Sequence, residues 1–199
     1  MKKYIPWIVI AIVSLMILFI KLPTPDITVR LFFEEESLHG QQYDMYYAEN
    51  VQNDFREGSM IHGDVDPDSR IVSFRLSGDH ESSLSGIRLD LPPDNTEELV
   101  VREVSVSSGG ITRKFYSGRE FFSPERIIVT NDLICTPIIS GTASIMPTGP
   151  DPYIAFSPDV VSEIRAMYSH FLLTRIALIA FIVLSYLIAS KDPFHSSTL

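Results

Sequence analysis

The chain has 199 residues, 45% of which are hydrophobic, and its formal net charge is −9 at pH 7. An acidic chain repels phosphate backbones, which argues against nucleic acid as a partner. Its single cysteine, Cys135, means that no internal disulfide can form.

The first predicted element is an uncharged apolar stretch at residues 4–20, between Lys3 and Lys21. A helix that crosses a bilayer needs roughly 20 apolar residues, with a working range of about 17–25. A cleaved signal peptide is the alternative for such an N-terminus, but no cleavage site of small residues follows the stretch. The sequence therefore predicts a transmembrane signal anchor at residues 1–21.

The middle of the chain, residues 22–158, has the period of β-strands. Apolar and polar residues alternate through 27–34, 70–77 and 85–91, as they do in half-buried strands. Gly109-Gly110 separates two further runs and predicts a two-residue hairpin. Clusters of Pro, Gly, Asn and Asp divide the remaining runs, and the pattern as a whole predicts an all-β, jelly-roll-like sandwich.

The run at residues 85–91 makes a specific prediction about faces. Side chains alternate along a strand, so Ile87, Leu89 and Leu91 should point into the core. Arg88 and Asp90 lie between them and should point outward.

The C-terminal part is again apolar. Residues 159–190 contain no Gly or Pro, and they predict a stalk that continues into a second transmembrane helix, followed by a cytoplasmic tail at 191–199. Lys2, Lys3 and Lys191 lie just outside the two apolar segments, where cytoplasmic lysines gather. The sequence therefore predicts a two-pass protein of the cell membrane with an extracytoplasmic middle domain.

Three tyrosines in a polar stretch are the candidate carbohydrate-binding residues: Tyr43, Tyr46 and Tyr47. Exposed aromatic faces stack on the C–H groups of pyranose rings in sugar-binding sandwiches. The alternative for any of these rings is that it fills the core.

Asp64, Asp66 and Asp68 resemble the start of a calcium loop and are the candidate metal ligands. An EF-hand loop requires Gly at position 6 and Glu at position 12, whereas this chain has Ser69 and Arg75 there. The candidate is thus a structural calcium site of another type, with an acidic turn as the alternative. No phosphate loop or nucleophile motif is present, so the sequence predicts no catalysis and no other cofactor.

The second apolar segment carries a face of small residues. Thr174, Ala177 and Ala180 are spaced three apart, with Arg175 beside them. Helices in membranes associate through small residues and polar contacts. These four residues are therefore the predicted contact with a larger multi-span membrane protein.

Two blocks resemble a known type of domain. The strand-like sequence at 84–93, followed by that at 99–106, and the segment at 148–156 are similar to blocks in the jelly-roll, carbohydrate-binding-module-like domains attached to bacterial membrane glycosyltransferases. The resemblance covers residues 27–157. The chain departs from that family because it has no multi-span catalytic core.

The resemblance implies a non-catalytic accessory subunit of a membrane glycosyltransferase or polysaccharide-assembly complex, whose sandwich binds glycan or braces the enzyme. A polyprenyl-phosphate glycosyltransferase would be the partner. The alternative is a scaffold or regulatory subunit of another membrane complex, without a glycan role.

Overall fold

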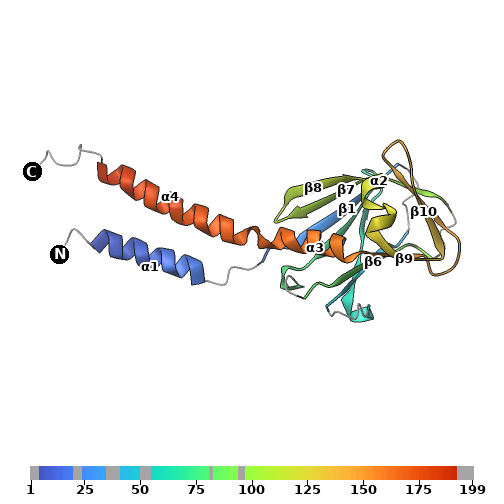
Figure 1. Ribbon diagram of the computed structural model, residues 1–199, viewed down its shortest axis with the longest axis horizontal. Helices are drawn as coiled ribbons and strands as arrows, with labels where there is room; N and C mark the ends of the chain where they lie inside the picture. The colour runs from blue at the N-terminus through green and yellow to red at the C-terminus, as the bar shows by residue number, and fades with distance from the viewer. Residues whose placement is uncertain are drawn as a thin grey trace, which may run out of the picture. The chain divides into compact units, whose positions relative to one another are not determined.

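The computed structural model describes residues 5–19, 24–34, 41–49, 55–80, 83–93 and 97–191 (Figure 1). The chain divides into two compact units. Thr24–Tyr168 forms one, and Met1–Pro23 together with Ser169–Leu199 forms the other.

The larger unit contains a seven-stranded antiparallel sheet in its described part. Its strand order is β10-β11-β7-β1-β5-β4, and β8 also pairs with β7. The strands are β1 (Ile27–Phe33), β4 (Asp64–Asp66), β5 (Ile71–Leu76), β7 (Leu99–Ser108), β8 (Ile111–Ser117), β10 (Leu133–Pro137) and β11 (Ala143–Pro147). The turn between β7 and β8 is Gly109-Gly110, and both glycines have positive φ (59° and 79°), as the hairpin prediction requires.

The second sheet has five described strands in the order β3-β2-β6-β12-β9, again antiparallel. These strands are β2 (Asp44–Ala48), β3 (Met60–His62), β6 (Gly86–Asp90), β9 (Ile127–Asn131) and β12 (Tyr153–Phe156). The two sheets enclose one hydrophobic core, so the predicted β-sandwich is confirmed.

The alternation of side chains positions the core and the outer faces. Ile87, Leu89 and Leu91 are buried, whereas Arg88 and Asp90 are half-buried on the other side of the strand, as predicted. One face of β6 therefore packs inward, and the opposite face can carry polar groups.

Short helices connect the strands. They are the 3-10 helices η2 (Glu57–Ser59), η3 (Gly78–His80) and η4 (Pro124–Arg126) and the α-helix α2 (Gly118–Phe121). Ser117 caps α2, because its Oγ accepts a hydrogen bond from the backbone N–H of Glu120 at 3.2 Å.

Helix α3 (Pro158–Ala166) corrects the predicted stalk. It begins after Ser157 with Pro158 in the first turn, where the missing N–H of proline has no cost. Val160, Val161 and Ile164 are buried in the sandwich core. The following 3-10 helix, η5 (Met167–His170), buries Tyr168, whose hydroxyl donates to the carbonyl of Ser77 at 3.2 Å. The first turns of the segment assigned to a stalk thus belong to the sandwich.

The smaller unit consists of α1 (Ile5–Phe19) and α4 (Phe171–Lys191), with Trp7 and Tyr186 in edge-to-face contact at 5.0 Å. Within the described ranges, no helix combines the length and apolar character needed to cross a membrane. The 15 residues of α1 span about 22 Å at 1.5 Å per residue, against roughly 30 Å of hydrocarbon. In α4, Arg175 and Lys191 limit the uncharged part to 176–190.

The predicted pair of transmembrane helices is therefore wrong, and so is the two-pass membrane localisation that depends on it. Lys2 and Lys3, on which the predicted topology relied together with Lys191, lie outside the described residues, as does the tail beyond Lys191.

Candidate binding face and polar groove

The structure separates the three candidate tyrosines. Tyr43 and Tyr47 are buried and belong to the core, so their assignment to an exposed carbohydrate-binding surface is wrong. Tyr46 is half-buried and lies on the opposite face of β2. The reason is the alternation along the strand, which puts residues 43, 45 and 47 inside and residues 44 and 46 outside.

Tyr46 belongs to a polar surface on the outer face of the five-stranded sheet. Residues directly opposite one another on neighbouring strands share a face. One row across the sheet consists of His62, Asp44, Asp90, Tyr153 and Asn131. The adjoining row consists of Met60, Tyr46, Arg88, Ala155 and Val129.

Arg88 is the centre of this surface. Its guanidinium makes a bidentate ion pair with Asp90, with both N–O distances at 2.7 Å. The same guanidinium lies over the rings of Tyr46 and Tyr153, at 4.4 and 4.6 Å from their centroids. Phe55 approaches it at 5.5 Å. We call the surface made by Tyr46, Arg88, Asp90 and Tyr153 the tyrosine–arginine face.

Carboxylates border this face. Asp44 lies opposite Asp90 across the strands and is 2.7 Å from Nδ1 of His62. Burial raises the pKa of Asp90, while its hydrogen bonds from Arg88 act in the opposite direction. The face therefore combines aromatic rings, a planar cation and hydrogen-bond acceptors, and the contacts of Arg88 hold these groups in place before any ligand arrives.

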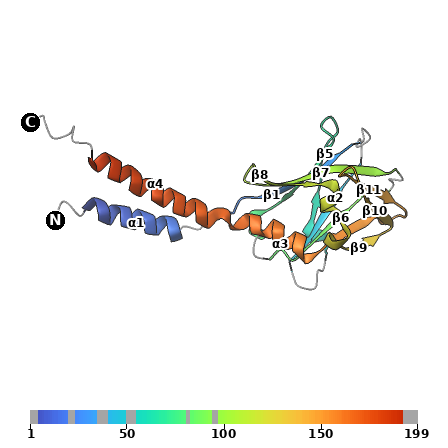
Figure 2. The ribbon, with the colours of Figure 1, turned by 45° about the horizontal axis from the view of Figure 1, so that its top comes forward.

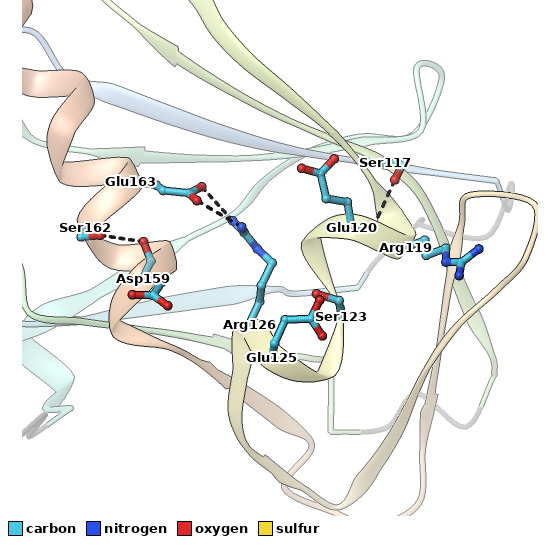
Figure 3. A pocket seen from close by; sticks show the side chains of 9 residues that line it. All are labelled: Ser117, Arg119, Glu120, Ser123, Glu125, Arg126, Asp159, Ser162 and Glu163. Carbon is cyan, nitrogen blue, oxygen red and sulfur yellow. Dashed lines mark hydrogen bonds and ion pairs between the residues drawn. The ribbon is translucent and has the colours of Figure 1, made fainter.

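A second polar feature lies where α3 meets α2 and η4 (Figure 3). It is an open groove of about 610 Å³, lined by Ser117, Arg119, Glu120, Ser123, Glu125, Arg126, Asp159, Ser162 and Glu163. We call it the Glu163 groove. In Figure 3, the side chain of Arg126 reaches from η4 towards Glu163 on α3, whereas that of Arg119 points away from it.

Glu163 links α3 to both sides of the sandwich. Its carboxylate accepts hydrogen bonds from Lys114 Nζ (3.1 Å) and the Tyr116 hydroxyl (2.5 Å), both on β8. Arg126 donates through both terminal nitrogens, at 3.3 and 3.0 Å. These donors, Arg126 first, lower the pKa of Glu163 to about 2. Because Lys114, Tyr116 and Arg126 all donate hydrogen bonds to this carboxylate, we infer that Glu163 fixes α3 against the sheets. We call this set of contacts the Glu163 clasp.

The three candidate metal ligands do not come together. Asp64 and Asp66 are exposed on the edge strand β4, and Asp66 Oδ1 accepts the backbone N–H of Ser69 in the following turn, which also contains Asp68. Among the described residues, no group of three or more His, Cys, Asp or Glu side chains is arranged to hold a metal ion. Asp64 and Asp66 thus belong to an edge strand, and Asp68 belongs to the turn that follows it.

The predicted partner contact lies on α4. Ala177 and Ala180 are exposed. Thr174 and Arg175 lie within the helix, but their side chains are outside the described part of the structure. The contact of these four residues with a larger membrane protein thus stays a prediction.

Comparison of the sequence with models of known protein families and with curated proteins gives no match. The resemblance to glycosyltransferase-attached jelly rolls therefore rests on the short blocks alone. Sequence reasoning placed Arg88 on the outside of its strand, but it did not connect Arg88 with Tyr153. The signal for Tyr153 is the alternation in β12, where Ile154 and Phe156 are buried.

Proposed function

We propose that the sandwich is a non-catalytic glycan-binding domain and that a glycan binds at the tyrosine–arginine face. The observation that carries the proposal is the stack of Arg88 between Tyr46 and Tyr153 on an outer sheet face. Pyranose rings have apolar C–H faces and a rim of hydroxyls. The half-buried rings of Tyr46 and Tyr153 offer a surface to the apolar C–H faces. The carboxylates of Asp44 and Asp90 offer hydrogen-bond acceptors to the hydroxyls.

In this proposal the chain assists an enzyme that lies outside it. The resemblance favours an accessory subunit that presents glycan to a glycosyltransferase or a polysaccharide-assembly complex. The acidic surface, with a net charge of −9 over the chain, favours neutral glycans over acidic ones, since like charges repel.

The test is binding of the full-length chain to an array of neutral and acidic oligosaccharides, followed by calorimetric titration with the strongest ligand. Tyr153→Ala should weaken binding at least about tenfold, equivalent to about 1.4 kcal/mol. Phe115→Ala is the matched control, because Phe115 is an aromatic residue that is 61% exposed on β8 of the other sheet.

If Tyr153→Ala retained the wild-type affinity for glycan, the glycan site would not be at the tyrosine–arginine face. Absence of binding to every glycan on the array would refute the glycan-binding role and favour the scaffold or regulatory alternative. Melting curves of both variants verify that the sandwich remains folded.

A further inference from the structure

The tyrosine–arginine face carries more negative than positive charge. It lies on the five-stranded sheet, whose strands β6 and β9 are drawn below β7 and β8 in Figure 2. Asp44 and Asp90 lie directly opposite each other on β2 and β6, and Asp151 precedes β12. The guanidinium of Arg88 pairs with Asp90. His62 contacts Asp44, but imidazoles are mostly neutral at pH 7.

The three carboxylates are close enough to repel one another. Burial raises the pKa of Asp90, the hydrogen bonds from Arg88 oppose that effect, and the charges of Asp151 and Asp44 add to it. Like charges directly opposite each other on neighbouring strands destabilise a sheet. Among the described residues, neither Asp44 nor Asp151 forms an ion pair with Lys or Arg. A cationic ligand would relieve this repulsion.

Asp44 is held in position at the border of the face. Gln42 Nε2 lies 3.3 and 3.1 Å from its two oxygens, and Nδ1 of His62 lies 2.7 Å from Oδ1. The side chain of Asp44 is 19% exposed, so a ligand on the face can reach a carboxylate that is largely removed from water. Charges attract each other more strongly there than in bulk water.

The aromatic rings of the face are a separate observation that points to the same ligand charge. Tyr46 and Tyr153 already hold one cation, the guanidinium of Arg88, at 4.4 and 4.6 Å from their centroids. The faces of aromatic rings attract cations through the ring quadrupole. Aromatic rings bordered by carboxylates therefore suit a ligand that has both apolar C–H faces and a positive charge.

The spacing of these groups fits an oligosaccharide. Asp44 and Tyr153 lie on either side of Asp90, in one row across β2, β6 and β12. At roughly 4.8 Å between neighbouring strands, Asp44 and Tyr153 are about 10 Å apart. A chain of linked pyranose rings can place one ring on Tyr153 and another beside Asp44.

We propose that the ligand of the tyrosine–arginine face is an oligosaccharide of amino sugars with free ammonium groups, one of which binds Asp44 while a ring stacks on Tyr153. This inference rests on the proposed glycan-binding function and adds the charge of the ligand to it. An N-acetylated sugar with the same ring has no charge at that position. It therefore gains no Coulomb attraction from Asp44.

The test compares two ligands that differ only in their acetyl groups, a glucosamine tetrasaccharide and an N-acetylglucosamine tetrasaccharide. Calorimetric titration of the full-length chain at neutral pH should show at least about tenfold tighter binding of the first. Asp44→Asn should remove most of this preference, because the amide has no charge. Asp64→Asn is the matched control, since it makes the same change on the exposed edge strand β4 of the other sheet, and it should keep the preference.

Melting curves show whether the variants fold, and Asp151→Asn replaces Asp44→Asn if the latter does not. Equal affinity of the wild type for the two tetrasaccharides overturns the ammonium inference but leaves glycan binding in place. A preference that Asp64→Asn weakens as much as Asp44→Asn comes from the net charge of the chain and also overturns it. Failure to bind either tetrasaccharide overturns it as well, whereas the glycan-binding role falls only if every glycan on the array fails.

Discussion

Replacing Glu163 by Gln removes the charge that clasps α3 to the sandwich while keeping the size of the side chain. The pKa of Glu163 falls from 4.5 to about 2 in the folded protein. At about 1.4 kcal/mol per unit, that shift of about 2.5 units is worth at most roughly 3.4 kcal/mol. The side chain is 33% exposed, and solvent screening reduces this contribution to about 2 kcal/mol.

The burial of Arg126 is a second reason why Glu163→Gln should lose stability. Its side chain is only 13% exposed, so Glu163→Gln leaves a largely buried cation without its carboxylate. Breaking such a pair is more costly than the net contribution of the intact pair. We therefore expect Glu163→Gln to lower the free energy of unfolding by at least about 2 kcal/mol at pH 7.

The pH dependence follows from the direction of the shift. A carboxyl whose pKa is lowered by folding stabilises the folded state above its unfolded pKa of 4.5. That stability is lost as the pH falls from about 5 towards about 2. In Glu163→Gln this part of the pH dependence should be absent.

Urea unfolding, followed by far-ultraviolet circular dichroism at several pH values, measures both effects. Tryptophan fluorescence is unsuitable, because the single tryptophan, Trp7, lies in α1 outside the sandwich. Glu120→Gln is the matched control: it makes the same change in the same groove, at a side chain with no ion pair among the described residues. A free energy of unfolding for Glu163→Gln equal to that of Glu120→Gln would refute the clasp.

Two further changes test the packing of the sandwich. Leu89→Ala should lower the free energy of unfolding in urea by about 2–5 kcal/mol, because Leu89 is fully buried. Ile111→Ala should lower it far less, because Ile111 is exposed. Equal losses for the two variants would contradict the register of β6. Gly118→Ala should destabilise the fold severely, because a Cβ there would lie 2.0 Å from the carbonyl oxygen of Val101. Gly58→Ala, where a Cβ meets nothing within 4 Å, should be tolerated, and similar melting temperatures for the two glycine variants would argue against that close approach.

The sequence determined the features that depend on neighbouring residues. Alternation predicted which side chains of β6 face inward, and Gly109-Gly110 predicted the β7–β8 turn, because both depend only on local backbone geometry. The same alternation separates Tyr46 from Tyr43 and Tyr47. Choosing the buried side required knowledge of where the second sheet lies, and the selection of tyrosines by polar surroundings was therefore wrong for two of the three.

Membrane crossing was inferred from apolar composition, and the structure contradicts it. The composition of a segment determines its hydropathy. The length of the helix and the charges within it determine how much of the bilayer's hydrocarbon the helix can span. α1 (Ile5–Phe19) has 15 residues, and Arg175 and Lys191 place charges within the 21 residues of α4.

Only the tertiary structure brought the candidate sites together. Tyr46, Arg88 and Tyr153 belong to three strands whose order and register are set by packing against the other sheet. Glu163 meets Lys114, Tyr116 and Arg126 because the apolar face of α3 is buried in the core. Contacts between residues far apart in the chain depend on how whole faces are buried, and no local pattern in the sequence encodes them.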